Sequence, residues 1–264
     1  MSHSDHIINF YSAYDEDGRL LKPYGQVEFI TTIRYIEKYV TPNARICEIG
    51  AGTGRYSRAI ADMGYAVDAV ELVPHNIEVF KDHIKPTQNI NVMEGNALDL
   101  HMLGDNTYDI TLVLGPMYHM YNTQDKRQVI AEALRVTKPN GVVMVAYIIS
   151  DAALLDNFML GSRWSWEEKI GRGMIDTTTF ATKSEPEDIL ELVRKEDIDS
   201  LMSGFPVQRL HYVATDLFSR YIRDGIGEMS EETYRLYLKY HFAVCERADM
   251  VGVSHHVLDV FRKN

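Results

Sequence analysis

Cysteine is scarce in this sequence. Only Cys47 and Cys245 occur among 264 residues, and no CxxC pair or Cys/His cluster has metal-ligand spacing. This composition excludes a disulfide-stapled scaffold and a zinc finger, because both need several closely spaced cysteines. We therefore expect two buried thiols in a reducing compartment and no metal site.

Positive charge is also scarce. The chain has 27 Lys and Arg against 38 Asp and Glu, which gives a formal net charge of −11. Such a chain would repel a nucleic-acid backbone, whose binding depends on Lys and Arg displacing counterions. The balance disfavours nucleic acid as a partner, although a local basic patch would be compatible with it.

Long apolar runs are absent. No stretch approaches 18 apolar residues, and the first 20 residues carry Asp5, Asp15, Glu16 and Asp17 without an apolar run. These features exclude a transmembrane helix and a signal peptide. We expect a soluble, cytoplasmic protein with no membrane partner. A chain of this length can bury one core domain without disulfides.

The sequence does contain a regular alternation of apolar runs and amphipathic stretches between Arg45 and Ile149. The helix-compatible spacings lie at 55–63, 75–83 and 124–136. This alternation is typical of βαβ units, so we predict an α/β fold with a Rossmann-like, doubly wound sheet. The β-branched runs place its first five strands at 45–49, 66–71, 90–93, 108–114 and 141–148.

The segments around this core extend the prediction to seven strands. An amphipathic helix is expected over 26–39, and another is expected to start at Ser184 and Pro186 and to end near Met202. Two more strands are expected at 206–213 and 252–261, with helices at 215–223 and 230–247 between them. The expected units are an N-terminal segment (1–43), a core (44–149), a helical cap or lid insertion (150–184) and a C-terminal part (185–264) with a helical pair at about 214–248.

A glycine-rich motif directly follows the first predicted strand and opens the first predicted helix. Glycine lets the backbone turn sharply and lets a ligand approach closely, while the helix N-terminus offers unpaired N–H groups. A tight turn without a ligand would use the same glycines. We take as candidate cofactor-binding residues Glu48, Gly50, Ala51, Gly52, Thr53 and Gly54.

Two carboxylates indicate the kind of ligand. Glu71 ends the second predicted strand, just before Leu72, and can accept hydrogen bonds from both ribose hydroxyls of an adenosine. Alone, it could equally be a solvated residue at a strand end. Glu48 stands two positions before Gly50. A pyrophosphate would be repelled by this carboxylate, whereas a sulfonium with its ammonium group would be attracted, so the motif favours a cationic ligand over NAD.

Four stretches, EIGAGTG, VELVPHN, EGNALDL and YDITLVLGPMYHMYN, together resemble the class I S-adenosylmethionine-dependent methyltransferases, especially the ubiquinone-biosynthesis-like branch that acts on small molecules. The resemblance covers residues 44–149. It implies S-adenosylmethionine as cofactor, with the glycines at its methionine end, Glu71 at its ribose and Asn96 with Ala97 at its adenine. The family more often has Asp at the position of Asn96, and an amide can also pair with adenine. Leu114 and Gly115 complete the candidate cofactor site.

The end of the fourth predicted strand offers candidates for the chemistry. His119 lies at the sheet edge where α/β folds bind ligands, and its imidazole could remove a proton from the methyl acceptor. The alternative is a structural histidine bonded to a loop carbonyl. Tyr118 could flank a planar substrate. The preceding Gly115 lacks the side-chain acceptor that amino-methylating nucleic-acid enzymes use at this point.

Aromatic residues outside the core are further candidates. Tyr11, Tyr14 and Arg19 precede the core, where members of this family cover their cofactor. Trp164 and Trp166 could form an aromatic wall for the substrate or could anchor the insertion to the body. The histidines near the predicted closing strand lack zinc spacing, so no metal is expected from His241, Cys245, His255 and His256.

These observations predict an S-adenosylmethionine-dependent methyltransferase that acts on a small molecule. Two alternatives remain open at this point: a methyltransferase for RNA or protein, and a catalytically silent protein that only binds S-adenosylmethionine. The sequence does not identify the acceptor, the methylated atom or the oligomeric state.

Overall fold

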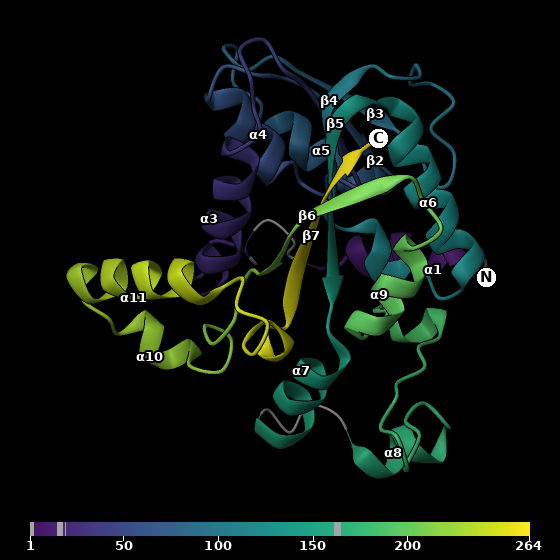
Figure 1. Ribbon diagram of the computed structural model, residues 1–264, viewed down its shortest axis with the longest axis vertical. Helices are drawn as coiled ribbons and strands as arrows, with labels where there is room; N and C mark the ends of the chain where they lie inside the picture. Colours follow the sequence, from purple (N-terminus) through teal and green to yellow (C-terminus); the bar gives the residue numbers. More distant parts are fainter. Residues whose placement is uncertain (1–2, 15–17, 19, 161–164) are drawn as a thin grey trace.

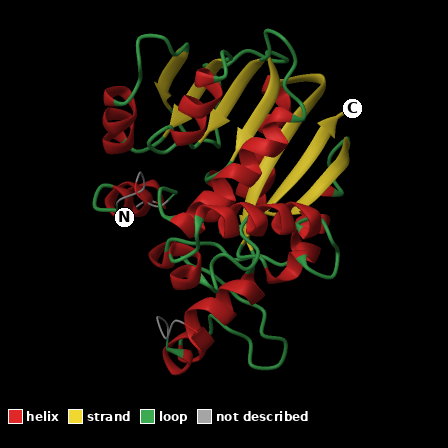
Figure 2. Cartoon of the chain, turned by 90° about the vertical axis from the view of Figure 1, so that its left-hand side faces the viewer, coloured by secondary structure: helices red, strands yellow, loops and turns green. Residues whose placement is uncertain are grey.

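The computed structural model describes residues 3–14, 18, 20–160 and 165–264, and in this part of the chain a seven-stranded sheet forms the centre of the molecule (Figure 2). The strand order is β3-β2-β1-β4-β5-β7-β6. β1 to β5 pair in parallel, and β7 runs antiparallel between β5 and β6. The strands are β1 Arg45–Ile49, β2 Ala66–Glu71, β3 Ile90–Glu94, β4 Tyr108–Val113, β5 Thr137–Ile148, β6 Val207–Ala214 and β7 His256–Lys263.

Helices cover both faces of this sheet. α3 contacts α4 on one face, and α6 contacts α9 on the other (Figure 1). The structure thus confirms the predicted doubly wound α/β fold. The helices of the body are α1 His3–Tyr11, α3 Pro23–Glu37, α4 Arg55–Asp62, α5 Pro74–Asp82, α6 Thr123–Val136, α9 Lys195–Met202, α10 Arg223–Gly227 and α11 Glu231–Val244.

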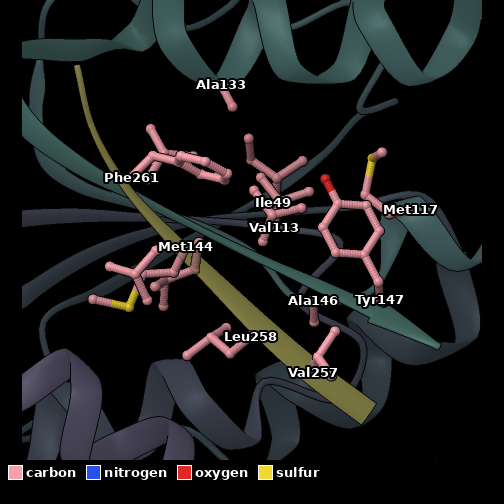
Figure 3. Packing of buried hydrophobic residues seen from close by; sticks show 14 of the residues in the cluster. Ile49, Val113, Met117, Ala133, Met144, Ala146, Tyr147, Val257, Leu258 and Phe261 are labelled. Atoms are coloured by element: carbon pink, nitrogen blue, oxygen red, sulfur yellow. The ribbon is translucent and has the colours of Figure 1, made fainter. Parts of the chain in front are cut away.

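The central strands are buried on both faces, as expected of a parallel sheet between helical layers. In β1 and β4 every residue but one is buried, and β5 is buried continuously from Val142 to Ile148. Phe261 of β7 packs with Ala133 on one side of the strand, while Leu258 lies on the other side (Figure 3). This rigid centre fixes the positions of the strand ends, from which the site is built.

The predicted core elements are confirmed with small shifts at their ends. α3 begins at Pro23, three residues before the predicted start, because proline suits the first turn of a helix. β5 begins at Thr137 rather than at 141. α11 agrees with the prediction, and the Ser230 side chain caps it by accepting a hydrogen bond from the backbone N–H of Thr233.

The long helix predicted from Ser184 to Met202 is wrong in its first half. Pro186 starts only a 3₁₀ turn, η3 Pro186–Asp188, and the chain then runs extended until α9 begins at Lys195. Tertiary hydrogen bonds explain the difference. The N–H of Glu191 donates to the carbonyl of Tyr118 (2.6 Å), and Val193 pairs with Ile149. These contacts outweigh the local helical preference.

One predicted helix in the C-terminal part is also wrong, and the closing strand is confirmed with a later start. Residues 215–222 form turns rather than a helix, and α10 begins only at Arg223. The hydroxyl of Ser254 holds this segment by accepting hydrogen bonds from the N–H groups of Asp216 (3.4 Å) and Leu217 (2.9 Å). The closing strand begins at His256 rather than at 252, since a 3₁₀ turn, η4 Val251–Val253, precedes it.

The insertion after β5 is helical in the part that the structure describes. α7 Ser150–Leu154 continues as a π-helix, η2 Leu155–Leu160, and α8 Trp166–Gly171 follows. α7 and α8 lie beyond one end of the sheet (Figure 1). Within residues 3–14, 18, 20–160 and 165–264, no helix has the length and apolarity needed to cross a bilayer.

Candidate active site

A cavity of about 380 Å³ lies at the carboxyl ends of the parallel strands. Its walls come from α1, α3, the glycine turn, the loops after β2, β3 and β4, and the segments next to β6 and β7. Open α/β sheets bind ligands at this edge. The cavity brings together most of the candidate residues: Tyr11, Tyr14, Glu48, Gly50, Ala51, Gly52, Thr53, Glu71, Leu72, Asn96, Ala97, Leu114, Gly115, Tyr118 and His119.

The glycine turn between β1 and α4 has a left-handed backbone. The φ angles are +69° at Gly50, +56° at Gly52 and +76° at Gly54. Gly54 has no room for a larger residue, because a Cβ atom there would lie 2.1 Å from the buried ring of Phe80. Other residues rarely adopt this conformation. The glycines therefore let the backbone turn tightly, with the N–H groups of Gly50 and Ala51 donating to the carbonyl of Val70 (2.8 and 3.1 Å).

Glu71 ends β2 and holds the glycine turn in place through hydrogen bonds. It is only 5% exposed. Its Oε2 accepts a hydrogen bond from the N–H of Gly52 (2.8 Å), and its Oε1 accepts from the N–H of Val73 (2.9 Å) and from Nδ2 of Asn76 (3.3 Å). The carboxylate is thus not a solvated strand end. Each carboxylate oxygen can accept more than one hydrogen bond, so Glu71 can also bind ligand hydroxyls.

Glu48 lies deeper, at the base of the turn. It is 1% exposed, and its Oε2 accepts hydrogen bonds from the N–H (2.9 Å) and the hydroxyl of Ser57. Burial raises the pKa of its carboxyl to about 8, against the opposing effect of the Ser57 hydrogen bonds, and the nearby charge of Glu71 raises it further. A cationic group in the cavity would favour ionisation of Glu48.

Asn96 has one side of its amide occupied. Its Oδ1 accepts a hydrogen bond from the N–H of Leu98 (3.0 Å), which closes a short turn after β3. This bond fixes the side chain where it lines the cavity. The remaining amide NH₂ group can donate to a ring nitrogen of a bound base.

His119 is held through both ring nitrogens. Nδ1 lies 2.8 Å from the carbonyl of Ile189, and Nε2 lies 3.2 Å from Oη of Tyr11. A carbonyl only accepts, so Nδ1 of the neutral ring carries the proton and Nε2 accepts from the tyrosine. The structure therefore contains the loop-carbonyl bond that was the alternative to a catalytic role. His119 links η1 (Pro116–His119) to α1 and to the extended segment before α9.

Known proteins with similar sequences are methyltransferases by name. The chain is 33% identical over 106 residues to a demethylmenaquinone methyltransferase of Renibacterium salmoninarum, covering 40% of this chain and 41% of that protein. It is 23% identical over 202 residues to a ubiquinone biosynthesis O-methyltransferase of Rickettsia akari, covering 70% and 73%. The chain thus spans about two fifths of the demethylmenaquinone methyltransferase.

A family model described as a methyltransferase domain matches residues 47–145, which hold the glycine turn and extend from β1 into β5. This match identifies residues 47–145 as a methyltransferase domain, and the names of the relatives agree with the class I S-adenosylmethionine-dependent family. The N-methyltransferase NodS from Bradyrhizobium japonicum, solved with S-adenosyl-L-homocysteine, shares the fold, with a TM-score of 0.62, 11% identity and 99% coverage of each chain. The expected family and its cofactor, S-adenosylmethionine, are confirmed.

A few predicted site residues lie elsewhere in the methyltransferase. Gly54 is not among the described residues that line the cavity, and it instead caps α4. Trp166 is also absent from that lining. It stacks on Phe158 with the ring centres 4.2 Å apart, which joins α8 to η2 within the insertion rather than to the body. Arg19 and Trp164 lie outside the described residues.

Sequence reasoning missed one part of the lining of the methyltransferase cavity. Glu28 of α3, Asp216 and Arg220 after β6, and His255 with His256 at the start of β7 all face it. β7 runs antiparallel to β5, so the amino end of β7 lies at the carboxyl ends of the parallel strands. A predicted strand from 252 to 261 concealed this, because it placed both histidines in the middle of the strand.

Proposed function

We propose that this methyltransferase transfers a methyl group from S-adenosylmethionine to a small molecule that binds in the same cavity. The continuity of the cavity carries the proposal. One cavity of about 380 Å³ contains both the glycine turn with Glu71 and a second group of aromatic and titratable side chains. Cavities of roughly 300–1,000 Å³ are typical of small-ligand sites.

The residues of the glycine turn fit the methyl donor. The glycines of the turn leave room for close approach of a ligand, Glu71 offers carboxylate oxygens for the ribose, and the buried Glu48 favours a positive charge nearby. Asn96 and Ala97 would contact the adenine, and Leu72, Leu114 and Gly115 would enclose it. Bound S-adenosylmethionine supplies a methyl group activated by its sulfonium.

The acceptor would lie against the other side chains of the cavity. Tyr11 at the end of α1, Tyr14 just after it, and Tyr118 with His119 of η1 give this part an aromatic wall with polar tips. Such a wall suits a small, partly planar molecule. The quinone-pathway names of the relatives agree with an acceptor of this kind. The net charge of −11 disfavours an RNA acceptor. The two free buried cysteines suit the reducing cytoplasm in which we place the protein.

Incubation with methyl-labelled S-adenosylmethionine and fractionated cell extract tests the proposal. We expect label in one or more small molecules, which mass spectrometry then identifies. Label that appears only in RNA or protein would favour the macromolecular alternative. Calorimetric binding of S-adenosylmethionine without transfer to any fraction would instead favour the catalytically silent alternative.

A further inference from the structure

The cavity contains a second histidine, His256, that is positioned by a carboxylate. Nδ1 of His256 lies 2.7 Å from Oδ2 of Asp216. Oδ1 of the same carboxylate accepts hydrogen bonds from the N–H of His256 (3.0 Å) and from the hydroxyl of Ser254 (2.7 Å). Asp216 is 3% exposed and His256 is 6% exposed. The ring of His256 is therefore held in one orientation at the cavity wall.

This hydrogen bond determines which nitrogen of His256 is available. An ionised carboxylate only accepts, so Nδ1 carries the proton and Nε2 of the neutral ring has a lone pair. Among the residues that the structure describes, none forms a hydrogen bond with Nε2 of His256, although the residue lines the cavity. His119 differs, because Tyr11 occupies its Nε2.

Asp216 and Glu28 place two carboxylates beside the ring of His256. Burial opposes ionisation of Asp216, but the charge and hydrogen bond of His256, with the charge of Arg220, together lower the pKa of Asp216. Oε2 of Glu28, from α3, lies 3.4 Å from Nδ1 of His256. Two carboxylates thus face the ring.

Other groups around the ring do not compete for the proton. Burial, with the nearby charges of Arg220 and His256, lowers the pKa of His255 well below its ordinary value, so this residue stays neutral. Arg220 is held by Asp156 of the insertion, to which its Nε donates (2.8 Å), and Arg223 pairs with the same carboxylate. Tyr118 approaches the ring of His256 with its own ring, at 5.9 Å between centres.

A cation site is the other chemistry that these side chains could provide. Ligand atoms of Asp216, His255 and His256 lie within 4.8 Å of one another. However, the 2.7 Å separation of Nδ1 and Oδ2 is a hydrogen-bond distance, and a metal ion between these atoms would remove that bond. Arg220 also adds positive charge beside them. Acid–base chemistry therefore fits the cluster better.

We propose that His256 is the catalytic base of the methyl transfer and that Asp216 is its positioning residue. The acceptor class follows: a small molecule methylated on an oxygen or nitrogen that carries a proton. As the acceptor atom bonds to the methyl carbon, the methyl–sulfur bond breaks and its electron pair stays on sulfur. The acceptor proton moves to Nε2 of His256, and solvent later removes it. This inference rests on the proposed function.

A first test needs no acceptor. Nitrogen-15 NMR of the histidine side chains, with S-adenosylhomocysteine bound and at pH 8.5, reports which ring nitrogen is protonated. We expect the Nδ1–H form for His256, assigned by the loss of its signals in His256→Gln, and a changed ratio of the two forms in Asp216→Asn. A neutral Nε2–H form in the wild-type protein would overturn the proposal, because that nitrogen could not accept a proton.

A second test uses the acceptor that the labelled-extract assay identifies. His256→Gln should lower kcat by about 10²- to 10⁴-fold and remove the rise of kcat with pH, while the affinity for S-adenosylmethionine stays nearly unchanged. Asp216→Asn should give a smaller loss. The matched control is His101→Gln, since His101 is exposed and pairs only with Asp99 among the described residues.

His119→Asn completes the comparison. If this variant loses the pH dependence while His256→Gln keeps it, His119 is the base and the proposal is wrong. A product methylated on a carbon that carries no acidic proton would also overturn it. If no fraction yields a labelled product, the proposed function fails, and the catalytic role fails with it whatever the NMR form. Circular dichroism of each variant separates these outcomes from misfolding.

Discussion

Two buried glutamates in the cofactor region differ in the number of hydrogen-bond donors around their carboxylates, and this difference suits them to different roles. Glu71 has three protein donors around its carboxylate, so its charge is well compensated. Glu48 has two donors, both from Ser57, among the residues that the structure describes, and it is almost completely shielded from solvent. The first is suited to bind hydroxyls, and the second is suited to respond to the charge of a ligand.

Glu71→Ala should weaken binding of S-adenosylmethionine by about 1.5–3 kcal/mol, the range for hydrogen bonds to a charged group. It should also lower the free energy of unfolding, because three buried or half-buried donors lose their acceptor. Calorimetric titration and urea unfolding measure the two effects. Glu94→Ala is the matched control, since Glu94 ends the neighbouring strand but is exposed. An affinity equal to that of the control would show that Glu71 has no role in binding.

Binding of S-adenosylmethionine should release protons near pH 7. With the pKa of Glu48 at about 8, the free protein holds its proton at neutral pH, and a cationic ligand stabilises the carboxylate and expels it. Affinity should therefore rise between pH 6 and 8, by at most about tenfold per pH unit, and level off above. Titration calorimetry in buffers of different ionisation enthalpy counts the protons. Glu48→Gln should bind without this dependence; proton release that persists in this variant comes from another group.

At the scale of elements, the spacing of apolar residues predicted the core, because each of its strands and helices has the apolar pattern typical of its type. β1 and β2 have the predicted bounds to the residue. The prediction failed where distant contacts decide the conformation. Val193 is extended because it pairs with Ile149, and residues 215–222 turn because Ser254 binds their N–H groups. Neither partner is visible in a local sequence window.

Gly54→Ala tests the glycine turn as an element. Alanine at position 54 would have to adopt a φ of +76°, and its Cβ would lie 2.1 Å from the buried ring of Phe80. Gly64→Ala is its matched control, with φ +93° and no atom within 4 Å. Both should lose about 1–2 kcal/mol for the left-handed backbone, and Gly54→Ala should lose roughly 1–3 kcal/mol more for overpacking. Urea unfolding gives the difference. Equal losses would mean that Phe80 moves aside freely.

At the scale of the molecule, the site divides into a part that the sequence revealed and a part that it hid. The residues of the glycine motif are consecutive in the sequence and Glu71 ends the next strand, so both could be found by position. Oδ2 of Asp216, two residues after the end of β6, lies 2.7 Å from Nδ1 of His256, the first residue of β7. Only the place of β7 between β5 and β6 brings them to the cavity.

S-adenosylmethionine and S-adenosylhomocysteine should raise the melting temperature of the whole protein, whereas NAD should not. A ligand at 100 times its Kd stabilises the native state by about 2.7 kcal/mol. For a chain of this size, that corresponds to a shift of roughly 5–10 °C. Thermal-shift measurement compares the three ligands at equal concentration. Stabilisation by NAD alone would contradict the assigned cofactor.

The position of β7 also has a consequence for the order in which the site forms during synthesis. The glycine turn and Glu71 emerge from the ribosome well before His256, which follows Glu71 by roughly 185 residues, or ~10–40 s at 5–20 residues per second. Until β7 inserts between β5 and β6, the growing chain has its cofactor residues but no base and an incomplete cavity wall. His256 and its part of the cavity wall are thus the last parts of the site to be synthesised.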